Sequence, residues 1–187
     1  MAIDKTVGRI MTSRIGLLGI IINIYLIGCS ASVQANFQDE LSNTCQQLPS
    51  SPQSNMNLGQ NLPISAQAKI GDQLVCLEIA QTPRQQQIGL MYRTSLAANR
   101  GMLFPYNPPR KVHFWMKNVR IPLDMVFLRD GEVMYVAANV PPCISWECPT
   151  YGPDLLIDQV IELRGGRAAE LGVEVGDRIN FIFLEDN

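Results

Sequence analysis

The chain has 187 residues, 47% hydrophobic and 17% charged, which is enough for one ordinary domain and a tail but not for a two-domain enzyme. Its net charge of -2 provides no basic surface to hold a phosphate backbone, so we do not expect nucleic acid as a partner. His113 is the only histidine, which excludes metal sites that need two or three imidazoles, and we expect neither a metal nor a cofactor.

Residues 1–28 have the order of a bacterial lipoprotein signal peptide. Lys5, Arg9 and Arg14 precede an apolar run over 15–27, which is shorter than the roughly 20 residues of a membrane span. The run ends in Gly28-Cys29, which resembles a lipobox. We therefore expect cleavage before Cys29, lipidation of Cys29, and anchoring of the exported protein to a membrane of the cell envelope. An uncleaved anchor, or an ordinary signal peptide with a chance cysteine, is the alternative.

The amino-acid composition after the signal peptide changes once along the chain, at residue 66. Residues 29–65 are rich in Ser, Gln, Asn and Pro and show no period of 2 or 3.6, so they predict a flexible polar tether. From Ala66 onward, apolar runs alternate with turn residues. This pattern predicts a single domain over 66–187.

The first half of the domain predicts short elements. Gly71-Asp72 separates two apolar segments, and the second of them alternates as a half-buried strand does. Thr82 is an expected helix N-cap, with Pro83 at the first helical position and Gln85 completing a capping box. Gly89 lies inside this helical pattern, which indicates a short helix.

The second half is predicted to consist mostly of strands. Asp130-Gly131 is typical of a type I′ turn and predicts a hairpin in which Phe127 faces Met134 and Met125 faces Val136. The fold class that follows is mainly β, a compact jelly-roll-like sandwich or barrel with one or two short helices. The expected elements are strands over 112–116, 121–128, 132–138, 155–163 and 178–184, and a helical turn over 168–171.

The domain contains a set of ordered motifs: Gly89–Arg93, Gly101–Phe104, Phe114–Asn118, Ile121–Phe127 and Ile161–Leu163, with Gly165-Gly166 and Gly176-Asp177. Together these motifs resemble the Domain of Unknown Function 192 family. The resemblance covers about residues 68–184 and implies a compact, jelly-roll-like β domain that is often exported and has no established activity. Val119 stands where that family commonly has a threonine, which argues against a hydroxyl role at this position.

Four cysteines remain when Cys29 is set aside for the lipid. In an oxidising compartment the proline-flanked pair Cys143 and Cys148 is the first choice for a disulfide that closes a short loop. Cys45 and Cys76 would then be free to pair with each other. Four cysteines allow three connectivities, and the sequence does not select among them.

The candidate site lies on one predicted strand and its neighbour. Alternation over 112–117 places His113, Trp115 and Lys117 on the face opposite the core, a mixture typical of a pocket wall. Asp124 points away from the core in the next strand, and the register of the intervening turn decides whether it meets His113 or Lys117. Asn118 is either a ligand contact or a turn former. The competing interpretation is a surface ion pair between Lys117 and Asp124.

Other chemistry has weaker support in the sequence. Glu78, Asp124 and Glu162 offer carboxylates, but strand residues of this kind are equally expected to pair with Arg84, Arg93 or Arg164. The methionines Met91, Met102, Met116, Met125 and Met134 contain soft thioether ligands for copper(I), yet packing in the core explains them better.

The leading hypothesis is a lipid-anchored envelope domain without an established activity. It would bind a small polar or saccharide-like ligand, or a partner protein, through His113, Trp115, Lys117, Asn118 and Asp124. One alternative is an envelope hydrolase or transferase that uses Asp124 with His113. The other alternative is a purely structural module.

Overall fold

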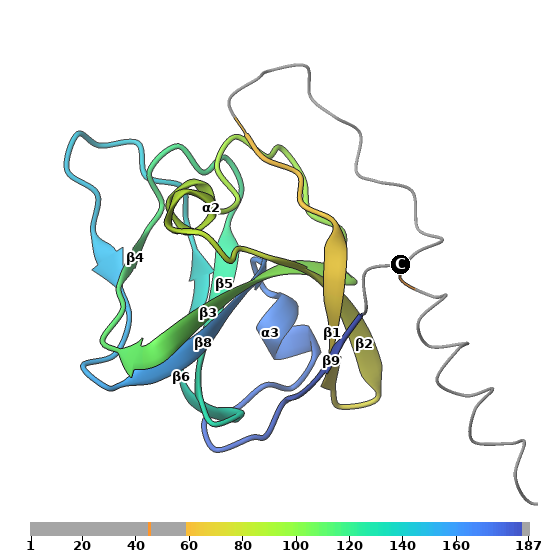
Figure 1. Cartoon of the computed structure of the whole chain (residues 1–187). Coiled ribbons are helices and arrows are strands. Elements are labelled where there is room, and N and C mark those ends of the chain that lie inside the picture. Colours follow the sequence, from red (N-terminus) through yellow and green to blue (C-terminus); the bar gives the residue numbers. More distant parts are fainter. Residues whose placement is uncertain (1–44, 46–58, 185–187) are drawn as a thin grey trace, which may run out of the picture.

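The computed structural model describes residue 45 and residues 59–184. These residues form nine strands and two short helices, which confirms the mainly β class (Figure 1). The elements are β1 (Ile64–Ile70), β2 (Gln73–Ile79), α2 (Pro83–Ile88), β3 (Arg100–Arg110), β4 (Phe114–Trp115), β5 (Leu123–Arg129), β6 (Glu132–Val140), β7 (Thr150–Tyr151), β8 (Ile157–Arg164), α3 (Arg167–Glu170) and β9 (Asn180–Phe183).

Seven of the strands form one curled sheet, in the order β6-β5-β8-β3-β2-β1-β9. Neighbouring strands in this sheet are antiparallel except β2 and β3, whose parallel pairing requires a crossover, and α2 lies in that connection. An isolated bridge from Glu132 to Arg178 brings the segment before β9 back to β6, so the sheet curls into a half-barrel. The remaining strands, β4 and β7, pair with each other in a separate small sheet.

Two apolar clusters lie on the two faces of the curled sheet. Alternate side chains along the central strands enter different clusters, as Met125 and Phe127 do against Val126 and Leu128. The first cluster is covered by residues of the α2 and β4 regions, such as Leu90 and Phe114, and the second includes Ala168 of α3. Strands buried on both faces explain why β5 is a nearly continuous apolar run.

The helix and the hairpin test the local predictions directly. The Thr82 side chain accepts from Gln85 N–H and Pro83 opens α2, which confirms the predicted capping box. Asp130 and Gly131 both have positive φ, as a type I′ turn requires. The predicted pairing is wrong by one residue, however, because a bulge after the first pairs of the hairpin places Phe127 opposite Tyr135 and Met125 opposite Ala137.

A short segment from residue 59 leads into β1 and is fixed by side-chain hydrogen bonds. Strand β1 starts at Ile64, and the Gln60 side chain donates to the backbone carbonyl oxygens of Gln85 and Gly89. Leu62 N–H donates to Glu78, which fixes the chain entry against β2. The predicted signal peptide, Cys29 and the tether up to residue 58, apart from Cys45, lie outside the described residues. Within the described part, no helix is long and apolar enough to cross a bilayer.

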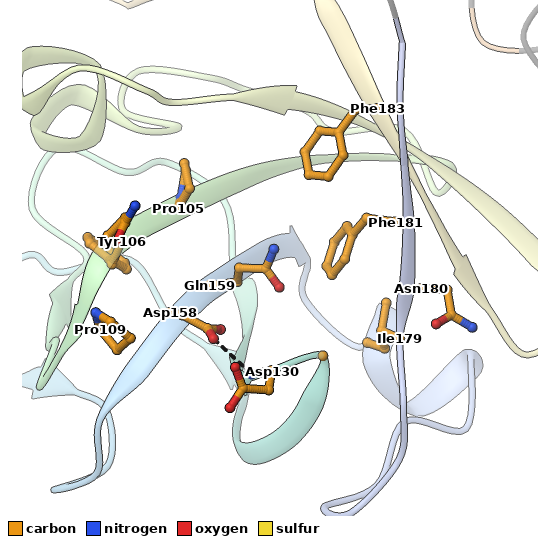
Figure 2. Close-up of a pocket in the computed structure, with 12 residues that line it drawn as sticks. Pro105, Tyr106, Pro109, Asp130, Asp158, Gln159, Ile179, Asn180, Phe181 and Phe183 are labelled. Carbon is orange, nitrogen blue, oxygen red and sulfur yellow. Dashed lines mark hydrogen bonds between the residues drawn. The ribbon is translucent and has the colours of Figure 1, made fainter.

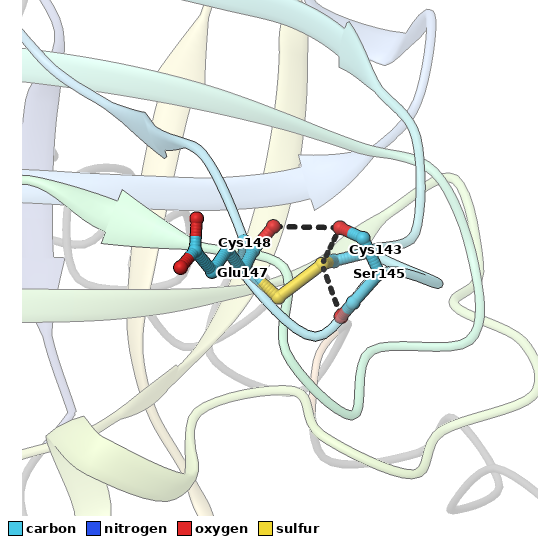
Figure 3. Close-up of a disulfide and its surroundings, with 4 residues drawn as sticks. All are labelled: Cys143, Ser145, Glu147 and Cys148. Carbon is cyan, nitrogen blue, oxygen red and sulfur yellow. Dashed lines mark hydrogen bonds between the residues drawn. A yellow bond between two sulfur atoms is a disulfide. The ribbon is translucent and has the colours of Figure 1, made fainter.

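Two disulfides join the four cysteines of the described residues. Cys143 pairs with Cys148, as predicted, and Cys45 pairs with Cys76, with a Cα–Cα distance of 5.7 Å in each. Figure 3 shows that the first of these closes a small loop in which Ser145 folds back on Cys143, its hydroxyl donating to the Glu147 carbonyl oxygen at 2.6 Å. Ile144 and Trp146 project from this loop and are 100% and 97% exposed.

Removing the Cys143–Cys148 bond is expected to have a modest effect on stability. Because the closed ring is short, the chain-entropy contribution is about 2 kcal/mol, and the loop residues Ile144 and Trp146 bury no core area. The double variant Cys143→Ser/Cys148→Ser should therefore melt a few degrees lower, with an unchanged far-UV circular dichroism spectrum. Loss of the folded spectrum at room temperature would contradict this expectation.

Candidate functional site

The predicted strand face at β4 is present, although the strand is short. Val112 and Met116 are buried in the first cluster, and His113, Trp115 and Lys117 are exposed on the other side. Lys117 Nζ lies 5.4 Å from the centre of the Trp115 ring, a cation–π contact. Trp115 is only 43% exposed because its other side lines a small pocket. His113 is not among the residues that line this pocket.

Asp124 does not take part in this cluster, which corrects the expected pairing with His113 or Lys117. The residue is fully buried, and its carboxylate accepts from the backbone N–H groups of Asn139, Gly166 and Ala168 at 2.6, 2.9 and 2.6 Å. These contacts hold the first turn of α3, whose N–H groups have no partner within the helix. Asp124 is therefore a structural carboxylate.

The reason for this correction is the position of β4. The prediction assumed that the strand at 112–117 pairs with the strand that carries Asp124, but β4 pairs with β7. Phe114 packs on the cluster that contains Met125 and Phe127, whereas Asp124 points to the opposite face of the sheet, toward α3. A surface ion pair between Lys117 and Asp124 and a joint acid–base role for Asp124 and His113 have no geometric support.

Asn118 forms a turn at the rim of the pocket. Its φ is +60°, a conformation that asparagine tolerates better than most residues, and its carbonyl accepts from Tyr92 N–H at 2.9 Å. Its side-chain amide contacts Met91 Sδ at 3.9 Å. Since Met91 lines the pocket beside Trp115, Asn118 positions part of the pocket wall.

The same pocket is lined by Glu162, one of three strand carboxylates that the sequence offers. We call this space the Glu162 pocket, and it is a cavity of about 30 Å³. Glu162 is on β8, and its Oε2 atom is buried without a hydrogen-bond partner among the described residues. The other lining residues come from α2 and the segment after it, from β3 and from the β4 region: Gln86, Gln87, Ile88, Gly89, Leu90, Met91, Phe104, Phe114, Trp115 and Val119.

The environment of Glu162 favours the neutral acid. Burial raises the pKa of this carboxyl to about 8, against a smaller lowering by the charge of Arg93. Arg93 is committed elsewhere, because its guanidinium forms two hydrogen bonds to Glu78, at 2.7 and 2.6 Å, and one to the Gln60 carbonyl. The Arg93–Glu78 pairing is one of those considered in the sequence analysis. Because its pKa is raised and Arg93 is bound to other groups, the Glu162 carboxyl is protonated at neutral pH and can donate a hydrogen bond.

Gly89 keeps the pocket open. It ends α2 with φ +48°, and a Cβ added there would lie 3.3 Å from Phe104 Cζ and 3.6 Å from Glu162 Oε2. Glycine therefore allows the end of the helix to approach the carboxyl closely. The cavity has room for a group about the size of one water molecule.

The described residues give no support for a metal site. They contain no group of three or more His, Cys, Asp or Glu side chains placed to hold an ion. The methionines considered for copper(I) pack in the first apolar cluster, where Met102, Met116 and Met125 are buried and Met91 and Met134 lie against it.

Comparison with known proteins places the chain in a family. Residues 66–181 match the DUF192 family, described as an uncharacterized ACR, and these residues span more than half of the chain. The chain belongs to the DUF192 family. No curated protein sequence matches it. The resemblance noted in the sequence motifs is confirmed.

Two solved structures resemble this DUF192 protein. A protein of unknown function from Novosphingobium aromaticivorans DSM 12444 is 35% identical, with a TM-score of 0.55 over 62% of this chain and 83% of the other. A protein from Sinorhizobium meliloti 1021, described as a candidate transcription regulator, is 33% identical, with a TM-score of 0.55 over 62% of this chain and 91% of the other. The function of this DUF192 protein is not established by these similarities.

Proposed function

We propose that this DUF192 domain binds a small neutral ligand through the Glu162 pocket. The ligand inserts one hydrogen-bond acceptor, a carbonyl or hydroxyl oxygen, toward Glu162, and its body packs against Trp115 at the rim. The observation that carries the proposal is the Glu162 carboxyl, which is buried, has an unpartnered Oε2, and borders a cavity. A buried polar group without a partner is costly, and a ligand oxygen would remove that cost.

The size and polarity of the pocket limit the ligand class. A cavity of about 30 Å³ holds a single polar group, so the remainder of the ligand must lie outside, where Trp115 is partly exposed. A protonated carboxyl donates to a neutral acceptor and would repel an anion once ionised. The Lys117 ammonium group lies over the ring of Trp115, which is the residue that lines the pocket.

The proposal includes the cellular setting inferred from the sequence. The charge, apolar run and lipobox that end at Cys29 support export and a lipid anchor in the cell envelope. Two disulfides in the described part are consistent with an oxidising compartment. Nucleic acid is not part of the proposal, although one structural relative is described as a candidate regulator, because the chain has a net charge of -2.

The binding proposal is tested by nuclear magnetic resonance on the full chain. Titration with N-methylacetamide, which offers one amide carbonyl, should shift the indole N–H signal of Trp115. Glu162→Met should abolish the shift, because it removes the donor, whereas Glu162→Gln should retain it through its amide N–H. In the wild type the affinity should fall as the pH rises through about 8 and Glu162 ionises, and in Glu162→Gln it should stay constant.

Glu147→Gln is the matched control, because Glu147 is an exposed carboxylate on the disulfide loop and its replacement should leave the titration unchanged. The proposal fails if no signal of Trp115 or its neighbours shifts at the highest N-methylacetamide concentration at which the protein stays in solution. It also fails if the Glu162→Met protein, shown to be folded by its spectrum, responds as the wild type does.

A further inference from the structure

A second and larger space lies where the half-barrel opens at β9. We call it the barrel-mouth groove, and its volume is about 570 Å³, within the range of small-molecule sites. Figure 2 shows its two sides, with Phe181 and Phe183 of β9 on one and Pro105 and Pro109 of β3 on the other. Ile179 N–H donates to the Gly131 carbonyl, so the β5–β6 hairpin tip borders the groove at one end.

An aromatic wall forms one side of this groove. Phe181 and Phe183 are two residues apart on β9 and therefore share a face of the strand. Their ring centres are 6.4 Å apart and the planes are inclined by 27°, so the two rings form a shallow platform. Phe183 is 59% exposed, and Figure 2 shows both rings turned toward the groove. Exposed aromatic rings beside a concavity are typical of binding surfaces.

Polar side chains line the opposite side of the groove. The Asp158 carboxylate accepts from Asp130 N–H through Oδ2 at 2.8 Å, and its Oδ1 is buried, so a ligand in the groove does not reach it. Gln159 is half-buried, extends into the space between the two walls in Figure 2, and its amide both donates and accepts. The groove therefore presents an amide, which can both donate and accept, facing an aromatic platform.

The charge of the lining disfavours an anionic ligand. The neighbouring guanidinium groups of Arg110 and Arg178 are engaged with the Tyr106 ring and the Asp130 carbonyl oxygen. No lysine or arginine lines the groove, and its two carboxylates, Asp130 and Asp158, lie 3.0 and 4.0 Å from the Arg129 guanidinium. A phosphate or carboxylate would meet negative charge with no cation on the lining, and a strongly cationic ligand would have to compete with Arg129. A neutral ligand with many hydroxyl groups meets neither difficulty.

We propose that the barrel-mouth groove binds a neutral saccharide, with one apolar face of a pyranose ring against Phe181 and Phe183 and its hydroxyls bonded to the Gln159 amide. This site is separate from the proposed function at Glu162. Gln159 and Glu162 are three residues apart on β8 and so point to opposite faces of the sheet. The ligand class follows from the lining, which combines flat aromatic rings, an amide and an acceptor without a free cation.

The test is a calorimetric titration of the full chain with three neutral disaccharides, namely maltose, cellobiose and N,N′-diacetylchitobiose. At least one should bind the wild type, and Phe183→Ala should weaken that binding about tenfold. Gln159→Leu should weaken it comparably, because it keeps the bulk of the side chain and removes the amide. The matched control is Ile182→Ala, whose side chain is exposed on the same strand but on the other face, and it should bind as the wild type does.

Three results would overturn the proposal. In the first, none of the disaccharides binds at concentrations up to about 10 mM, which would mean that every dissociation constant is above the range expected for a specific site. In the second, a folded Phe183→Ala protein binds with unchanged affinity. In the third, binding survives Phe183→Ala but is lost in Glu162→Met, which would assign the saccharide to the Glu162 pocket and leave the proposed function standing.

Discussion

Asp124→Asn is expected to lower the free energy of unfolding by about 3 kcal/mol. The wild-type carboxylate is fully buried and satisfies three backbone N–H groups, on Asn139, Gly166 and Ala168. Asparagine offers one oxygen in place of two, and its amide N–H₂ would face at least one of these donors. The loss can be measured by urea unfolding followed by circular dichroism.

Asp154→Asn is the control for this result, because Asp154 forms only an exposed contact with Lys111 at 3.3 Å. Its replacement should change stability by less than about 0.5 kcal/mol. Equal stability of the Asp124→Asn protein and the wild type would contradict the assignment of Asp124 as a structural carboxylate.

Glu162→Gln is expected to change how stability depends on pH. The pKa of Glu162 is about 8 in the folded protein, against 4.5 for an ordinary glutamate. Between these values the unfolded chain releases a proton that the folded domain keeps, so the contribution of Glu162 is fully present below pH 4.5 and is lost as the pH rises to about 8. One pKa unit corresponds to about 1.4 kcal/mol, so the wild type should lose several kcal/mol relative to Glu162→Gln over this window.

The measurement is a set of urea unfolding curves for both proteins from pH 4.5 to 9. The difference in free energy of unfolding between them should grow with pH and level off above about 8. Glu147→Gln provides the comparison for removing an exposed carboxylate, and its difference from the wild type should stay nearly flat. A flat difference for Glu162→Gln as well would show that Glu162 ionises in the folded protein as readily as in water.

Local patterns in the sequence predicted local structure well. The α2 capping box and the Asp130-Gly131 turn depend on a few neighbouring residues, so they could be read without knowledge of the fold. The register beyond the turn could not, since the bulge that moves Phe127 opposite Tyr135 has no signal in the apolar pattern.

Strand β3 shows why longer elements escaped prediction. Its eleven residues contain Gly101, Pro105, Pro108 and Pro109, which usually mark turns or strand ends. The pairing with β2 ends at Leu103, and the pairing with β8 is irregular between Pro105 and Arg110, so the proline-rich half needs fewer ladder hydrogen bonds. The prolines are tolerated because the pairing of β3 with β2 and β8, which are distant in sequence, leaves this half of the strand with few backbone N–H donors to satisfy.

The candidate site was predicted in part. Alternation indicated the exposed face of His113, Trp115 and Lys117, but the partner of β4 is a strand pairing that periodicity does not specify. Glu162 carried a usable signal, because it is a carboxylate between apolar residues in the stretch 160–163 of β8. A charge in a strand segment that is buried on both faces must be paired or neutral.

Of the two tryptophans of the chain, one lies in the disulfide loop and the other lines the Glu162 pocket. Trp146 projects from the loop into solvent, whereas Trp115 borders the pocket beneath the ammonium group of Lys117. The protein therefore contains two native fluorophores in unlike surroundings. With Trp146 replaced by phenylalanine, the remaining indole emission comes from the pocket rim alone, and occupancy can be followed optically without a label.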